Sequence, residues 1–67
     1  MTTLTFWVDS EAKDQLNECD LSFIDCDDQL CFNYDCPDEL IESLLPDELI
    51  EFIGIDSEFL VNIADPN

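Results

Sequence analysis

Apolar residues recur at three- and four-residue spacings between Pro37 and Ile53, in a stretch that contains the hexapeptide PDELIE twice. Each copy begins with Pro followed by two acids, which is typical of a helix start, because Pro fixes φ at the first position and acids favour the positive end of the peptide dipoles. Pro46 would clash with the carbonyl of Glu42 in a continuous helix. The pattern therefore predicts either a sharp kink or two helices, Asp38 to Leu44 and Pro46 to Ile53, with Gly54 as C-cap.

The same spacing places the apolar side chains of this stretch on one face and leaves the acids to water. We expect the buried face to consist of Leu40, Ile41, Leu44, Leu45, Leu49, Phe52 and Ile53.

Elsewhere the apolar and polar residues alternate with period two, which predicts strands with one buried face. The predicted strands are Thr2 to Val8, Leu21 to Asp25, Gln29 to Tyr34 and Glu58 to Ile63. The second and third form a hairpin around the polar segment Cys26-Asp27-Asp28. Trp7 points away from the alternating apolar face of its strand, where it either packs under a helix or is exposed on the side of a partner. We expect the first, because large aromatics usually find a core.

Asp9 and Ser10 are possible N-caps for a short helix that ends at about Glu18. Only one or two turns of helix are supported. We expect Lys13 to pair locally with Asp9 or Glu11, because these acids lie within a turn of it.

The elements follow in the order strand, helix, strand, strand, helix or helix pair, strand, which is the order of a split β-α-β sandwich. We therefore predict a small α+β domain over residues 1 to 67, with a mostly antiparallel sheet of three to four strands and helices packed on one face. Another small α+β topology remains open because the first helix is so short. Asp65-Pro66-Asn67 is predicted to be a frayed tail.

The 67 residues suffice for one domain, and 46% of them are hydrophobic, which distinguishes the chain from acidic disordered sequences. Eighteen acids against Lys13, without Arg or His, give a net charge of -17. So negative a chain is repelled by anionic membranes and by nucleic acid, so we expect no membrane and no direct nucleic-acid binding. The N-terminus has neither basic residues nor an apolar block, and we expect a soluble, unexported, cytoplasmic protein.

The four cysteines Cys19, Cys26, Cys31 and Cys36 have the spacing C-x6-C-x4-C-x4-C. This spacing contains no C-x2-C knuckle, and there is no histidine to complete a mixed site, so we expect neither zinc nor another cofactor. Disulfides are not expected in an unexported chain. The thiols are interpreted as reduced side chains that act as small hydrophobes.

Catalytic machinery is poorly represented in the sequence. Without His, Arg or a Gly-rich loop, nucleophilic and phosphoryl-transfer mechanisms lack their parts, and we expect no enzyme activity. A calcium loop starting at Asp25 would need Gly at its sixth position and Glu at its twelfth, where the chain has Leu30 and Cys36. No metal site is therefore predicted.

The density of the acids is the main indication of function. Carboxylates three or four residues apart on a helix are about 5 to 6 Å apart at Cβ, comparable to the phosphate spacing along a nucleic-acid strand. An acidic face is usually just a solvated face, but a surface kept soluble normally mixes both signs of charge, and this chain omits one. The candidate partner-binding residues are Asp25, Asp27, Asp28, Asp35, Asp38, Glu39, Glu42, Asp47, Glu48 and Glu51.

In size, charge and style of fold, the chain resembles the small acidic DNA mimics of phages and mobile elements, which include anti-CRISPR proteins, anti-restriction proteins and inhibitors of DNA-repair glycosylases. This resemblance implies an anti-CRISPR-type inhibitor, a monomer that acts stoichiometrically in the host bacterial cytoplasm. It would block the DNA-binding surface of a basic nucleic-acid-binding protein or effector complex. The alternatives are an acidic antitoxin or immunity-type module, and an adaptor that binds a basic protein through an apolar patch.

Salt is predicted to stabilise the folded protein, because its carboxylates repel one another and about 0.15 M salt screens charges beyond about 8 Å. The melting temperature should rise with sodium chloride, and it is followed from low to high salt and also at mildly acidic pH. A melting temperature that stays flat or falls with salt would show that the charges are paired or too far apart to repel.

Overall fold

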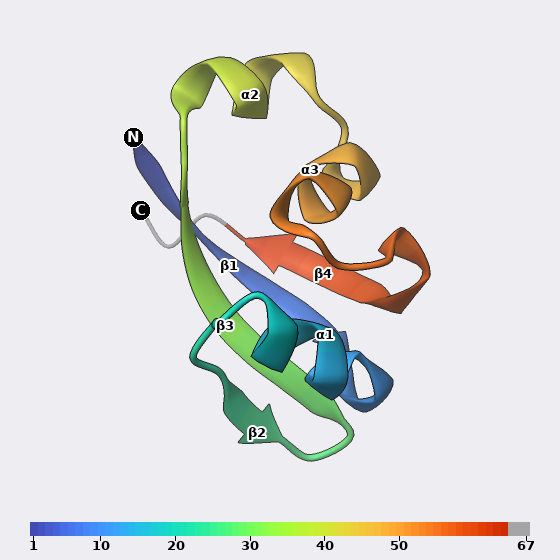
Figure 1. The fold of residues 1–67 in the computed structure, drawn as a ribbon. Helices are drawn as coiled ribbons and strands as arrows, with labels where there is room; N and C mark the ends of the chain where they lie inside the picture. Colours follow the sequence, from blue (N-terminus) through green and yellow to red (C-terminus); the bar gives the residue numbers. More distant parts are fainter. Residues whose placement is uncertain (65–67) are drawn as a thin grey trace.

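The computed structural model describes residues 1–64, which form a four-stranded antiparallel sheet with its helices on one face (Figure 1). The strands are β1 (Thr2–Asp9), β2 (Ile24–Cys26), β3 (Gln29–Cys36) and β4 (Leu60–Ala64). The α-helices are α1 (Lys13–Glu18), α2 (Asp38–Ser43) and α3 (Pro46–Ile53), with 3-10 turns η1 (Ser10–Ala12) and η2 (Ser57–Phe59). The predicted α+β class is confirmed.

The strands lie in the order β2-β3-β1-β4, with every neighbouring pair antiparallel. Because β1 and β2 are both antiparallel to β3, they run parallel to each other with β3 between them. This is the split β-α-β arrangement predicted from the element order. The register of β1 and β3 runs without interruption from Thr2 opposite Cys36 to Asp9 opposite Gln29.

Two strands begin later than the sequence predicted. The predicted strand from Leu21 is shortened to β2, and a two-residue turn, Asp27-Asp28, connects it to β3. Asp27 has a φ of 57°, a conformation that Asp and Asn tolerate in tight hairpins. The predicted strand from Glu58 starts only after η2, since Phe59 N–H bonds to the carbonyl of Asp56 and closes a turn there. The predicted tail, 65 to 67, lies outside the described residues.

The core lies between the sheet and the helices α1 and α3. Leu4, Phe6 and Val8 alternate along β1 and are buried, as the period-two pattern predicted. Phe6 stacks on Phe32 of β3 with ring centroids 5.1 Å apart and an interplanar angle of 9°. The remaining buried side chains are Ala12, Leu16, Leu30, Cys36, Leu49, Ile50 and Ile55.

The two PDELIE copies form two separate helices, as predicted, but their environments differ. The backbone is extended at Leu44 and Leu45, where the chain leaves α2 and enters α3. In the second copy Leu49 and Ile50 are buried, whereas α2, built from the first copy, contains no buried residue. Identical hexapeptides therefore contribute unequally to the core, because their position relative to the sheet decides burial and their own sequence does not.

Two residues of the predicted apolar face are exposed, which corrects the prediction. Leu45 is 68% exposed and Phe52 is 58% exposed. The break before Pro46 gives α3 its own helical phase, set by Leu49 and Ile50. At about 100° per residue, Phe52 then projects about 110° away from the mean direction of those two side chains.

Trp7 does not pack under a helix, so this expectation was wrong. Its neighbours Leu4, Phe6 and Val8 already occupy the helix-covered face of the sheet, and strand geometry sends Trp7 to the opposite face. Cross-strand pairing places Cys31 on one side of Trp7 and Asn62 on the other. Trp7 is half-buried there.

Gly54 ends α3 with φ 116° and ψ 18°, as expected for a glycine C-cap. Its N–H bonds to the carbonyls of Glu51 and Ile50 at 3.0 and 3.3 Å. A Cβ at this position would lie 2.8 Å from Sγ of Cys19 at the end of α1. The positive φ therefore favours glycine here, and a Cβ would in addition force Sγ of Cys19 to move.

We predict that Gly54→Ala lowers the free energy of unfolding by about 2 kcal/mol, because it combines positive φ with a steric clash. Denaturant titration of Gly54→Ala, Cys19→Ala and the double variant measures this cost. The double variant should recover part of the loss, since it removes the sulfur. A Gly54→Ala protein as stable as the wild type would contradict the prediction.

Candidate functional site

Every carboxylate in the described part of the chain is exposed. Of the eighteen acids, all but Asp65 lie within residues 1–64, and no polar or charged side chain in this range is buried. The longest dimension of the molecule is 30 Å. Seventeen carboxylates over that length correspond to one per about 1.8 Å of axis, close to the one charge per 1.7 Å of double-stranded DNA.

These charges are almost without internal compensation. Within residues 1–64 the single ion pair joins the N-terminal ammonium to Asp38 at 4.0 Å. Lys13 therefore forms no ion pair with Asp9 or Glu11, which corrects the expected local pairing: its side chain is exposed and remains in water. The repulsion among the carboxylates is not relieved by neighbouring cations.

Nine of the ten candidate residues fall into two groups and the tenth, Asp35, lies on β3 between them, so the structure does not bring them all together. Three lie at the β2–β3 turn, whereas most of the others lie on α2 and α3 at the other end of the molecule (Figure 1). Strand β3 separates the two ends by about 23 Å, at 3.3 Å per residue. The turn group is Asp25, Asp27 and Asp28, and the helix group is Asp38, Glu39, Glu42, Asp47, Glu48 and Glu51.

Three candidates have partners within the chain. Asp35, on the helix-free face of β3, accepts a hydrogen bond of 2.5 Å from the hydroxyl of Thr3. Asp38 accepts one of 2.5 Å from the hydroxyl of Thr2. Glu48 accepts the backbone N–H of the residue before α3 at 3.1 Å and so caps that helix. These three side chains therefore help to hold the fold as well as contributing charge.

A hollow of about 280 Å³ lies beside α2 and is lined by Thr2, Asp38, Ile41 and Glu42. Asp38 and Glu42 are four residues apart on α2 and therefore share one face. Two carboxylates above an aliphatic side chain match the chemistry of a lysine or arginine, whose methylenes pack on apolar surface while the charged head pairs with acids. The hollow is the part of the helix group best shaped to receive a cationic side chain.

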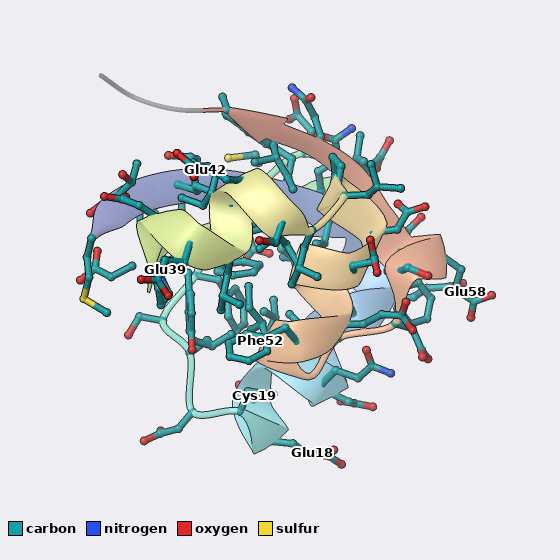
Figure 2. All side chains as sticks on the ribbon, turned by 90° about the horizontal axis from the view of Figure 1, so that it is seen from above. Glu18, Cys19, Glu39, Glu42, Phe52 and Glu58 are labelled. Carbon is teal, nitrogen blue, oxygen red and sulfur yellow. The ribbon has the colours of Figure 1, made fainter. Side chains whose placement is uncertain are left out.

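Several exposed acids outside the candidate set extend the negative surface. In Figure 2, Glu39 and Glu42 lie on one side of the helices, Glu58 on the other side, and Glu18 at the end of α1. The acids therefore surround the helix-bearing side. The candidate set chosen from the sequence omits Glu18 and Glu58, because it was drawn from the PDELIE repeats and the hairpin. The acidic composition of the whole chain would have included them.

Leu45 and Phe52 form an apolar interruption within this acidic surface. Leu45 is the extended residue immediately before α3, and Phe52 lies in the last turn of that helix. Their neighbours in sequence include Asp47, Glu48 and Glu51. Exposed apolar side chains framed by acids can contact a partner in addition to the charges.

The four thiols lie in four different environments. Cys36 is buried in the core, so its interpretation as a small hydrophobe is confirmed, whereas Cys26 is exposed, so that interpretation is wrong for it. Sγ of Cys19 lies 3.5 Å from the carbonyl of Ile53 and links α1 to α3. Burial raises the pKa of the Cys31 and Cys36 thiols, with smaller contributions from Cys26 and from the Asp35 carboxylate, respectively.

The described residues contain no group of three or more His, Cys, Asp or Glu side chains arranged to hold a metal ion. Catalysis by paired carboxylates needs one of them in an apolar, desolvated setting, and every carboxylate of residues 1–64 is exposed. The arrangement is suited to binding cationic surfaces.

Comparison with known proteins gave no match to a family model, to a curated protein or to a solved structure. Among residues 1–64, no helix has the length and apolar character needed to cross a membrane.

We predict that alkylation of the native, reduced protein at pH 8 modifies Cys26 first and Cys36 last, with at least a ten-fold difference in rate. The thiolate is the reactive form, and burial of Cys36 both raises its pKa and blocks access. Mass spectrometry of timed iodoacetamide reactions gives the order. Equal rates for Cys26 and Cys36 would mean that the core opens readily.

Proposed function

We propose that the protein is a DNA-mimic inhibitor of anti-CRISPR type, which blocks the DNA-binding surface of a bacterial defence effector by stoichiometric binding in the cytoplasm of the host. It acts as a monomer, without catalysis or a cofactor. The observation that carries this proposal is the exposure of every described carboxylate at a linear charge density close to that of duplex DNA.

The mechanism follows from the charge distribution. A protein that holds DNA presents lysine and arginine side chains to phosphates, and the carboxylates of the helix group can pair with the same cations. The uncompensated field accelerates encounter and makes it sensitive to salt. The acidic hollow beside α2 offers one cationic side chain a site with an aliphatic wall.

Rigidity supports mimicry. Helix α3 is anchored in the core by Leu49 and Ile50, and Gly54 closes it against α1. The backbone positions that carry its acids are therefore set before the partner arrives, and Glu48 is also held by its hydrogen bond to the N–H of Leu45, which lowers the entropic cost of binding.

A second candidate function is that of an adaptor, or an antitoxin or immunity-type module, for a basic protein. The exposure of Leu45 and Phe52 favours it, because an apolar patch of this kind can provide affinity that does not depend on charge. Binding by such an adaptor would change little with salt.

We predict that reversing Glu39, Glu42, Asp47 and Glu51 to Lys weakens inhibition cumulatively. Exposed pairs contribute about 0.2 to 1 kcal/mol each, so a single reversal should reduce affinity by less than about five-fold, and four reversals at the middle of that range should reduce it by about 50-fold. The wild type is first screened against a panel of purified CRISPR effector complexes and restriction enzymes. Binding of each variant to the effector that the wild type binds is then measured by fluorescence anisotropy across a salt series.

The control is compared with the triple reversal of Glu39, Glu42 and Glu51, and it reverses Asp14, Glu18 and Glu58, which are also exposed but lie outside the helix group. This control variant should retain most of the affinity at physiological salt. Both sets of reversals reduce self-repulsion, so the melting temperature should rise, and loss of binding is then not a loss of folding. A single reversal that abolishes binding, or affinity that is independent of salt, would contradict mimicry.

A further inference from the structure

The face of the sheet opposite the helices carries no covering element within residues 1–64 (Figures 1 and 2). Residues paired directly across antiparallel strands project to the same face. The register therefore places Ile24, Cys31, Trp7 and Asn62 in one row across all four strands. We call this row, together with the neighbouring row of Asn33, Thr5 and Ala64, the open face.

The open face is uncharged at its centre, in a chain where 18 of 67 residues are acidic. Along β1 and β3, acids occur only at the two ends of the open face. Asp9 lies at one end and Asp35 at the other. Thr5 donates a hydrogen bond of 2.8 Å to the side chain of Asn33, so these polar groups already satisfy each other. The open face therefore combines the apolar side chains of Trp7 and Ile24 with neutral polar ones and has an acid at each end, and an uncharged centre with charge at the margin is typical of a protein interface.

A hollow beside the open face adds shape to this surface. Its volume is about 300 Å³, and it is lined by Ser22, Phe23, Ile24, Cys31, Phe32 and Asn33. It forms where β2 stops and β3 continues, because β2 pairs only as far as Ile24 opposite Cys31. Ile24 is 68% exposed at its edge. A single large apolar side chain fits such a hollow.

The charge of the chain indicates which kind of molecule can bind the open face. A second copy of the chain would bring another net charge of -17 against an acidic rim, and anionic lipid or nucleic acid would be repelled in the same way. A basic protein is attracted by the rim, and an apolar side chain on it gains by leaving water in the hollow.

We propose that the open face is a second contact surface, which takes a large apolar side chain flanked by lysine or arginine on the basic partner, with Ile24 and Trp7 as its centre. The inference rests on the proposed function in that the partner is a basic protein. Long-range attraction by the carboxylates does not distinguish one basic protein from another. The open face supplies that discrimination, because burial of an apolar group requires a matching shape.

The test uses synthetic seven-residue peptides with a central Phe or Ala between three lysines on each side, and a Phe peptide flanked by glutamates. Trp7 is the only tryptophan, so its fluorescence reports directly from the open face. Amide chemical shifts of the labelled protein locate the contact. The lysine-flanked Phe peptide should perturb Trp7 and the hollow and bind at least five-fold more tightly than the Ala peptide.

Two variants at exposed apolar positions provide the comparison. Ile24→Ser should remove the preference for Phe over Ala, whereas Phe52→Ser, on the helix side, should retain it. Both side chains are largely exposed, at 68% and 58%, so neither substitution opens the core.

Equal, salt-sensitive binding of the Phe and Ala peptides would overturn this inference and leave the proposed function intact. Failure of both lysine-flanked peptides to bind would count against the proposed function and the inference together. Equally tight binding of the glutamate-flanked peptide would also overturn the inference. Sedimentation could also show that the protein self-associates and that Ile24→Ser abolishes this self-association. That result would overturn the inference, because it would identify a second copy of the chain as the occupant of the open face.

Discussion

Burial of one face of β1 and β3 against α1 and α3 must hold this chain together against its own charge. Phe6 and Phe32 stack at the centre of that face, with Leu16 of α1 and Ile50 of α3 buried in the same core. No carboxylate of the described residues enters the core, and a single weak ion pair at the N-terminus is the only internal neutralisation in residues 1–64. The fold therefore depends on apolar packing, and the acids oppose it.

Because the acids oppose folding, their positions on the surface are informative. Exposed acids lie on the helix-bearing side and at the hairpin turn, and Asp9 and Asp35 lie at the two ends of the open face, whereas the centre of the open face carries none. If the acids served solubility alone, cations would be expected among them, because mixed charge keeps proteins soluble without destabilising them. In the proposed function, the same uncompensated charges attract a basic partner from a distance. The uncharged open face then offers shape-dependent contact at short range.

Local patterns predicted the elements well, because strand alternation at Leu4, Phe6 and Val8 and the proline-led helix starts depend on neighbouring residues alone. The errors arose where tertiary context decides. Leu45 is exposed because it lies in the extended break between α2 and α3, and Phe52 is exposed because the contact of α3 with the sheet sets the phase of that helix. Trp7 was directed away from the helices by the pairing of its own strand.

For the candidate site, too, composition predicted some features and tertiary structure decided the others. That the acids would be exposed was predictable from composition, because buried carboxylates need partners that this chain lacks. The length of β3 separates the turn group from the helix group, and only the three-dimensional arrangement reveals this. The two hollows were equally invisible in the sequence. One depends on Thr2 of β1 approaching α2, and the other on β2 being shorter than β3.

Competition with DNA tests the central claim most directly. A basic effector that binds the protein is loaded with a fluorescent duplex, and the protein is titrated while anisotropy and the mass of the complex are followed. The account predicts that DNA is released completely at about one protein per DNA-binding site, and that excess duplex reverses the inhibition. A stable ternary complex of effector, DNA and protein would contradict it.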